Sequence, residues 1–112
     1  MKKTVCVFGG ISKSGIEKYT KIAYELGHVL GNQGADIVCS GTRRGMIGSL
    51  IDGASGQGAR IVAVIVEGSG EIDLIHPSVH KCIQAHSLAD RKNLMLGMAD
   101  LFISLPGGIG TL

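Results

Sequence analysis

The sequence lacks tryptophan and has few aromatic residues of any kind, which bears directly on nucleic-acid binding. Phe, Trp and Tyr make up 4% of the 112 residues, so an aromatic platform for stacking single-stranded bases is missing. The formal net charge is only +2 at pH 7, whereas a nucleic-acid partner calls for a broad basic surface. Any function of positive charge must therefore be local, and we expect no nucleic-acid partner.

Long apolar runs and paired cysteines are also absent. No stretch approaches the roughly 20 apolar residues of a membrane span. The short run from Thr4 to Phe8 meets two glycines at once, so it predicts a strand rather than a signal peptide. The three cysteines, Cys6, Cys39 and Cys82, have no paired spacing and are typical of reduced thiols. We expect a cytoplasmic protein without a membrane contact.

Several familiar catalytic patterns do not occur. None of the glycine loops matches a P-loop, in which Lys and Ser or Thr directly follow the glycines, and the first loop lacks the Gly-x-Gly-x-x-Gly spacing of a NAD site. The Gly-x-Ser-x-Gly elbow of many hydrolases is missing as well. His76, His80, Cys82 and His86 match no standard zinc spacing. We therefore expect no metal and no cofactor, and interpret these histidines as scattered loop residues.

Glycine, in contrast, is abundant: the chain has 18, where average usage gives about eight. Strand-like and helix-like segments alternate between these glycines. This alternation predicts one α/β domain over residues 1–112, with a Rossmann-like, doubly wound parallel sheet and helices on both faces. Apolar, β-rich runs predict strands at Thr4 to Phe8, Ile37 to Cys39, Arg60 to Val66 and Leu101 to Leu105.

The first predicted helix contains unusual glycines. Apolar residues recur at helical spacing from Tyr19 to Leu30, and Gly34 is a natural C-terminal stop. Gly27 and Gly31 lie inside this helix, four residues apart on one face, where they lower its helix propensity. Close packing against a neighbouring element accounts for glycine at such positions.

Capping residues mark the starts of helices. Ser14 and Glu17 have capping-box spacing before the first helix, and Ser87 is placed to cap a helix from Leu88 to about Met98. The apolar face of Met46 to Ala54 predicts another helix between them. The remaining segments are a predicted loop over Glu67 to Pro77 and a stretch of ambiguous type, with a short strand among the options, over Val79 to Ala85.

Three predicted strands end in glycine-containing loops, at Gly9 to Gly15, Ser40 to Gly48 and Pro106 to Thr111. In a doubly wound sheet these loops share the carboxyl-terminal edge, where ligands bind. Glycine lets the backbone approach an anion, and the next helix points its N–H groups at it. One such loop is equally well explained as a tight turn, but all three together favour a phosphate site. The candidate phosphate-binding residues are Gly10, Ser12, Gly41, Thr42, Arg91, Lys92, Gly107, Gly108, Ile109, Gly110 and Thr111.

Arg91 and Lys92 form a second signal. With Ser87 as the cap, Arg91 falls in the first turn of its helix, near the ligand edge, because helices in this fold run antiparallel to the strands. Cations there oppose the helix macrodipole at a cost of about 0.3–1 kcal/mol each, which a bound phosphate or carboxylate offsets. A solvated surface pair is the other interpretation. Arg43 and Arg44, in the second loop, are equally open to phosphate contact and to simple exposure.

Arg91-Lys92 followed by Pro106-Gly107-Gly108-Ile109-Gly110-Thr111 resembles the RK…PGGxGT signature of the LOG ("lonely guy") family, whose members are often labelled lysine decarboxylases. Phe8 to Ser12 resembles the family's FCGSS loop, and Ser40 to Gly48 resembles its GGGxxGLMG loop. The resemblance spans essentially the whole chain. Members of this family are phosphoribohydrolases that activate cytokinins.

The resemblance implies hydrolysis of the N-glycosidic bond of a nucleoside 5′-monophosphate, of the AMP or cytokinin riboside monophosphate type, to free base and ribose 5-phosphate. A carboxylate must then stabilise the oxocarbenium character of the ribose, as in glycoside hydrolysis generally. The resemblance implies Arg91 as a catalytic residue at this centre, and the glycine loop with Thr111 as the holder of the 5′-phosphate. It also implies a homodimer or a higher homo-oligomer, for which Gly27 and Gly31 permit close helix contact.

Departures from the family pattern leave alternatives open. Ser40 and Thr42 replace glycines, and Lys81 stands where many members have a substrate-contacting Glu. The family's catalytic Glu falls two residues beyond Leu112, so we expect a fragment of a longer protein or a truncated product. A non-catalytic module that binds a nucleotide or carries molybdenum cofactor is the main alternative. DNA processing, another role of this fold, is disfavoured by the low charge and the missing Trp.

Overall fold

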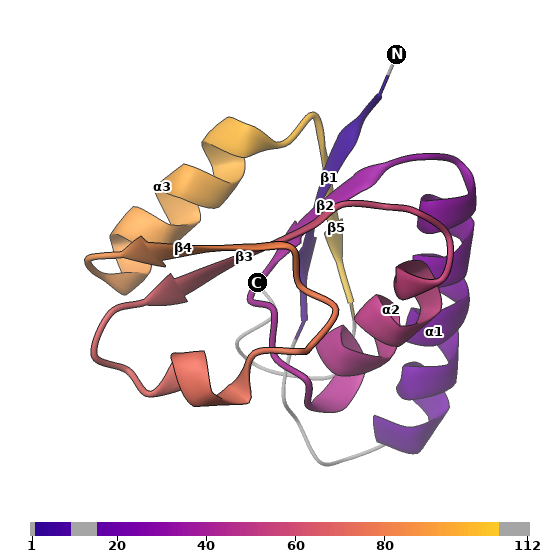
Figure 1. Cartoon of the computed structure of the whole chain (residues 1–112), viewed down its shortest axis with the longest axis horizontal. Coiled ribbons are helices and arrows are strands. Elements are labelled where there is room, and N and C mark those ends of the chain that lie inside the picture. The colour runs from indigo at the N-terminus through magenta and orange to yellow at the C-terminus, as the bar shows by residue number, and fades with distance from the viewer. Residues whose placement is uncertain (1, 10–15, 106–112) are drawn as a thin grey trace.

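The computed structural model describes residues 2–9 and 16–105 of the chain, which form alternating strands and helices (Figure 1). This confirms the predicted α/β class. The elements are β1 (Thr4–Phe8), α1 (Ile16–Asn32), β2 (Asp36–Cys39), α2 (Gly45–Ser55), β3 (Ile61–Val66), the 3₁₀ helix η1 (Glu71–Leu74), β4 (Lys81–Ala85), α3 (Leu88–Met98) and β5 (Leu101–Ser104).

The strands form one parallel sheet in the order β4-β3-β2-β1-β5. The chain steps outward from β1 to β4 and then returns to the other side of β1 for β5. Cys6 of β1 therefore pairs with Val38 of β2 on one side and with Phe102 of β5 on the other. The strand order reverses between β1 and β5, which is where open α/β sheets bind their ligands.

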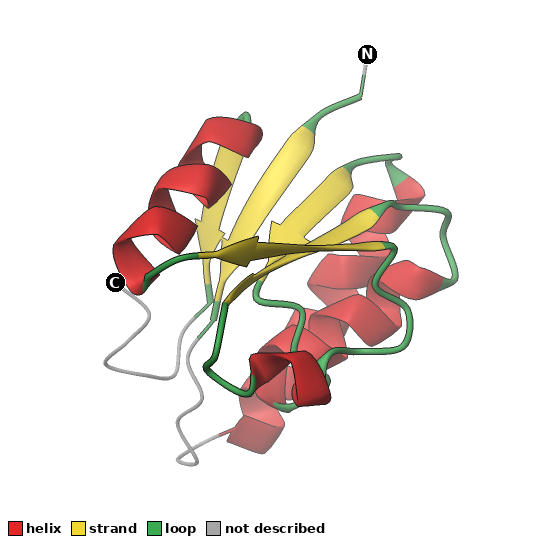
Figure 2. Cartoon of the chain, turned by 60° about the vertical axis from the view of Figure 1, so that its left-hand side comes forward, coloured by secondary structure: helices red, strands yellow, loops and turns green. Residues whose placement is uncertain are grey.

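Helices cover both faces of the sheet, as predicted. Figures 1 and 2 show α1 and α2 together on one face and α3 alone on the other. In the described residues, no helix is long and apolar enough to cross a membrane.

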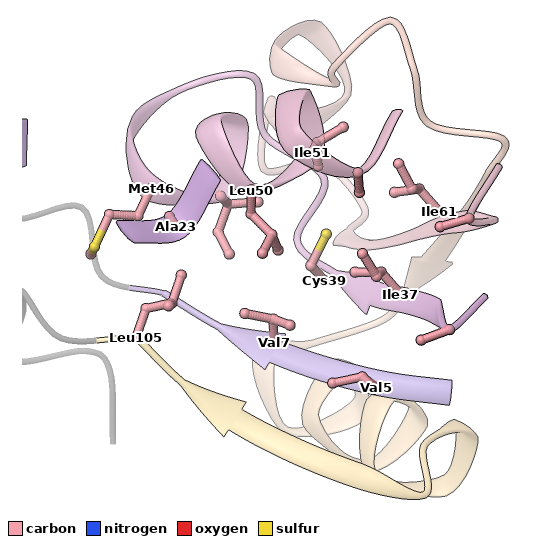
Figure 3. Close-up of a cluster of buried hydrophobic side chains, with 14 residues drawn as sticks. Val5, Val7, Ala23, Ile37, Cys39, Met46, Leu50, Ile51, Ile61 and Leu105 are labelled. Atoms are coloured by element: carbon pink, nitrogen blue, oxygen red, sulfur yellow. The ribbon is translucent and has the colours of Figure 1, made fainter. Parts of the chain in front are cut away.

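The core divides into two layers because successive strand residues point to opposite faces. Figure 3 shows the layer beneath α1 and α2, where Val5, Val7 and Ile37 meet Leu50 and Ile51. The other layer lies beneath α3 and contains the buried residues Cys6, Val38, Val62, Val64, Ala85 and Met95. Strands that bury both faces read as continuous apolar runs, which is why β3 reads Ile-Val-Ala-Val-Ile-Val.

Glycines bring α1 and α2 into backbone contact. A Cβ atom added to Gly27 lies 2.0 Å from the Leu50 carbonyl oxygen, and one added to Gly31 lies 2.6 Å from the Gln57 Cβ atom. The predicted close packing is confirmed. Because this surface is filled within the chain, the two glycines are not available for the helix contact between copies that the sequence suggested.

The end of α1 follows the sequence prediction closely. Gly34 has a φ of 76°, a left-handed conformation that favours glycine. Its N–H group donates to the Gly31 carbonyl oxygen at 3.0 Å, and the Ala35 N–H group donates to the Leu30 carbonyl oxygen at 3.0 Å. This pair of bonds is a Schellman motif, which satisfies the last carbonyl groups of the helix.

Two segments differ from, or refine, the sequence prediction. The stretch from Glu67 to Pro77 is not only loop, because it contains the short helix η1. The ambiguous stretch from Val79 to Ala85 contains the edge strand β4. Edge strands have one solvated side, and most of β4 is exposed, so its sequence lacks the apolar run that marks the inner strands.

The capping box of Ser14 and Glu17 depends on side chains outside the described ones.

Candidate functional site

The carboxyl ends of the parallel strands define one edge of the molecule (Figure 2). β1 and β5 end together here, and the Leu105 N–H group donates to the Phe8 carbonyl oxygen at 2.7 Å. Gly10, Ser12, Gly107, Gly108, Ile109, Gly110 and Thr111 lie outside the described residues. Gly41, Thr42, Arg91 and Lys92 are described.

Internal contacts explain the conformation of the second glycine loop. Gly41 has a φ of 75°, and a Cβ atom there lies 2.3 Å from the Ala63 Cβ atom, so both conformation and space select glycine. The Gly41 carbonyl oxygen accepts from the His76 N–H group at 2.8 Å. Thr42 forms a bridge with Ile75, and its hydroxyl oxygen accepts from the Arg44 N–H group at 3.2 Å. Phosphate binding at Gly41 and Thr42 thus stays a prediction.

The two arginines of this loop have different surroundings. The Arg43 guanidinium donates to the Asp73 carbonyl oxygen at 2.7 Å, and the Arg43 N–H group donates to the Leu74 carbonyl oxygen at 2.8 Å. Arg44 is exposed at the N-cap of α2, where it provides no side-chain cap. Arg43 therefore holds the loop against η1, and Arg44 faces solvent.

Ser87 caps α3 as the sequence predicted. Its hydroxyl oxygen accepts from the Asp90 N–H group at 3.1 Å, while the Asp90 carboxylate accepts from the His86 N–H group at 2.8 Å. This reciprocal arrangement fixes the start of the helix. It places Arg91 in the first turn, at the carboxyl edge of the sheet, and leaves Lys92 exposed.

Arg91 forms an ion pair that the sequence analysis did not foresee. Its guanidinium Nη1 lies 2.7 Å from Oε2 of Glu71, with the two side chains 22% and 30% exposed. Burial alone raises the pKa of Glu71, but bonds from the Val66 N–H group, the Ser69 hydroxyl and the Arg91 guanidinium together lower that pKa. The charge of Arg91 is therefore balanced within the chain by the Glu71 carboxylate, so the position of Arg91 does not by itself require a bound anion. Substrate binding at Arg91 stays a prediction.

The three histidines between β3 and α3 contact different parts of the chain. His76 is buried and its Nε2 atom lies 2.6 Å from Asp52 Oδ1, while the Nδ1 atom of His80 accepts from the Ile61 N–H group at 3.0 Å. His86 pairs with Glu67 at 3.1 Å, and its hydrogen bond to this carboxylate raises the pKa of His86. Across residues 2–9 and 16–105, no group of three His, Cys, Asp or Glu side chains can hold a metal ion.

The three cysteines are free thiols, and two of them are buried in the core. Burial raises the pKa of Cys6 to about 11 and that of Cys39 to about 12. Both thiols therefore stay protonated at neutral pH, and protonated thiols are poor nucleophiles. They act as small apolar core residues.

Glu71 is the functional candidate that sequence reasoning missed. It lies 20 residues before Arg91 in the chain and within a stretch that the sequence presents as a loop. The available signal was a carboxylate just after the carboxyl end of a buried strand, the edge at which ligands bind.

The parallel sheet, the reversal of strand order at β1 and the cationic helix start define a Rossmann-like domain with its candidate site at the carboxyl edge. The family model described as "possible lysine decarboxylase" matches residues 47–112. The chain therefore belongs to this family, the LOG family whose motifs it resembles.

Curated relatives extend the match over nearly the whole chain. A cytokinin riboside 5′-monophosphate phosphoribohydrolase of Rhodococcoides fascians is 34% identical over 97% of the chain and 56% of the relative. A probable cytokinin riboside 5′-monophosphate phosphoribohydrolase of Oryza sativa subsp. japonica is 34% identical over 98% of the chain and 45% of the relative. The chain thus spans about half the length of these relatives.

Solved structures share the fold at lower sequence identity. The molybdenum cofactor carrier protein of Chlamydomonas reinhardtii matches with a TM-score of 0.84 and 22% identity, over 99% of the chain and 66% of that structure. The molybdenum cofactor binding protein of Rippkaea orientalis matches with a TM-score of 0.83 and 21% identity, over 99% of the chain and 66% of that structure. At this identity, the likeness concerns the fold alone.

Proposed function

We propose that the intact protein hydrolyses the N-glycosidic bond of a nucleoside 5′-monophosphate, releasing the free base and ribose 5-phosphate, without a metal or other cofactor. The observation that carries this proposal is Arg91 at the carboxyl edge of the sheet, in a chain 34% identical to a named phosphoribohydrolase over 97% of its length. Cytokinin riboside 5′-monophosphate is the substrate in the names of the relatives, and we include AMP because it is a nucleoside 5′-monophosphate of the same type.

The chemistry assigns distinct tasks to the candidate residues. As the bond to the base breaks, positive charge develops on the ribose, and a carboxylate stabilises it and orients the attacking water. Arg91 binds the anionic substrate and places the ribose at this centre, because a guanidinium recognises phosphate through several parallel N–H donors. The backbone from Gly107 to Thr111 and the loops at Gly10, Ser12, Gly41 and Thr42 hold the 5′-phosphate, while Lys92 adds positive charge nearby.

The direct test incubates the full-length protein with AMP and measures adenine and ribose 5-phosphate. We expect both products in equal amounts. An Arg91→Ala variant should lose turnover, whereas an Arg60→Ala variant should keep it, since Arg60 is an exposed arginine just before the amino end of β3. Base release that is equal in wild type and a folded Arg91→Ala variant would remove Arg91 from the mechanism.

A second candidate is a module of the same fold that binds a nucleotide or molybdenum cofactor without cleaving it. The observation in its favour is that Ser40 and Thr42, in the loop after β2 at the carboxyl edge, replace glycines of the family's second loop. Saturable AMP binding without any adenine release, in the assay above, would favour this carrier role over hydrolysis.

A further inference from the structure

The ion pair between Arg91 and Glu71 differs from the other ion pairs of the described residues. Its two side chains are 22% and 30% exposed, so both partners are largely withdrawn from water. The pairs Lys2–Asp36, His76–Asp52 and His86–Glu67 each contain at least one side chain that is 60% exposed or more. Partial burial reduces screening by water, and the Arg91–Glu71 pair is therefore the one best protected from solvent.

The Glu71 carboxylate is itself held in place by neighbouring groups. Its Oε1 atom accepts from the Val66 N–H group, at the end of β3, at 2.8 Å. The Ser69 hydroxyl lies 2.9 Å from Oε1 and 2.6 Å from the Val66 carbonyl oxygen. Because a hydroxyl has one hydrogen, it donates to one of these two oxygens at a time. The second carboxylate oxygen, Oε2, remains for Arg91 at 2.7 Å.

This arrangement leaves most of the Arg91 donors free of Glu71. A guanidinium has five N–H donors, and Glu71 accepts from the Nη1 group. Within the described chain, the pair thus fixes one end of the guanidinium while the other donors remain for an anion. Fixing a long side chain before binding lowers the entropy cost of the substrate contact.

We propose that Glu71 is a positioning residue, which holds the Arg91 guanidinium at the carboxyl edge in the orientation that receives the anionic substrate. The inference rests on the proposed function, because it assigns Arg91 a substrate to receive. A purely structural pair joining η1 to α3 is the competing interpretation, and it predicts a change in stability alone.

The test uses AMP and compares three variants with the wild type. Glu71→Gln keeps the size of the side chain and an oxygen for the Val66 N–H group but removes the charge. Glu67→Gln is the matched control, because Glu67 lies on the same connection and pairs with His86 through side chains that are 51% and 81% exposed. Ser69→Ala removes one neighbour of the carboxylate and gives a milder second variant. Calorimetry gives the Kd for AMP, adenine release gives kcat, and thermal unfolding gives Tm.

We expect Glu71→Gln to weaken AMP binding or lower kcat by about tenfold or more, with Ser69→Ala shifting the same constant less and Glu67→Gln staying within about twofold. Should Glu71→Gln fail to fold, the Ser69→Ala shift decides. A Glu71→Gln variant with the Kd and kcat of the wild type would overturn the inference, whether or not its Tm is lower. If Glu71→Gln does not fold, unchanged Kd and kcat in Ser69→Ala would overturn it.

Failure of the proposed function gives a different result. If the wild type binds AMP without releasing adenine, hydrolysis fails, and the Kd values of the same variants still confirm or overturn the positioning role. If the wild type neither binds nor cleaves AMP, the positioning role falls as well, because Arg91 then has no substrate to receive.

Discussion

Glu71 shows how one carboxylate joins separate parts of the chain. It accepts hydrogen bonds from β3 and from its own turn, and it pairs with a guanidinium from α3. Each of these contacts favours the charged form over the protonated form, and together they outweigh the effect of partial burial. The side chain is therefore an anion in the folded protein at neutral pH.

This balance predicts a pH-dependent stability. The folded-state pKa of Glu71 lies below the ordinary value of 4.5, so the carboxylate stabilises the fold above that value and loses this effect as the pH falls through its folded-state pKa. We expect Glu71→Gln to cost roughly 1 kcal/mol at neutral pH and less at about pH 3. Denaturant unfolding of both proteins at the two pH values measures the difference, and a pH-independent cost would contradict this account.

Sequence patterns identified Arg91 but not its partner. The motif with Arg91 and Lys92 and the cap at Ser87 are local signals, and the cap is confirmed. Glu71 meets Arg91 only because β3 and β4 are parallel neighbours whose ends share one edge. A contact of this kind follows from topology, so residue spacing alone does not reveal it.

At the scale of elements, the contact between α1 and α2 depends on missing side chains. A Cβ atom added to Gly27 meets the Leu50 carbonyl oxygen at 2.0 Å, and one added to Gly53 meets the Tyr24 carbonyl oxygen at 2.0 Å. Each helix thus places its backbone against a glycine of the other. The close approach buries the apolar faces of both helices above the sheet (Figure 3).

We expect Gly27→Ala to destabilise the protein by about 1–3 kcal/mol, because the added methyl group forces the helices apart. Gly97→Ala is the matched control: Gly97 also lies inside a helix, but no atom of the described residues lies within 4 Å of its added Cβ atom. That change should stabilise the fold by about 0.5–1 kcal/mol through helix propensity. Denaturant midpoints measure both, and a neutral Gly27→Ala would contradict the packing.

The elements were predictable to different degrees. β1, β2 and β3 were predicted from apolar runs, within one residue at their ends, because inner strands must be apolar on both faces. β5 was predicted equally closely from its run Leu-Phe-Ile, although it is the other edge strand of the sheet and is mostly exposed. β4 remained ambiguous, since Lys81, Cys82 and Gln84 are exposed on an edge strand. η1 was missed because four residues are too few to show a helical period.

At the scale of the whole molecule, the face of the sheet beneath α3 is the less covered one. Among the described residues α3 lies alone there, and Leu96 and Phe102 are 42% and 49% exposed. Phe102 pairs with Cys6 and so points to the α3 side of the sheet. Half-exposed apolar side chains of this kind are groups that association can bury.

We expect a homodimer or a higher homo-oligomer, as the LOG resemblance implies. Light scattering at micromolar concentration should therefore give at least twice the mass of one chain. The glycines of α1 give no support to this prediction, because α2 already fills their surface. A monomeric mass across the micromolar range would exclude the assembly.

The central claim is that the protein cleaves the base from a nucleotide that it holds by the 5′-phosphate. The most direct measurement compares base release from the common nucleoside 5′-monophosphates with release from the matching nucleosides, which lack the phosphate. Arg91 at the carboxyl edge and the phosphorylated substrates named for the relatives lead us to expect release from at least one monophosphate and at least about a hundredfold less from its nucleoside. No release from any monophosphate, or equal release from a nucleoside, would contradict the claim.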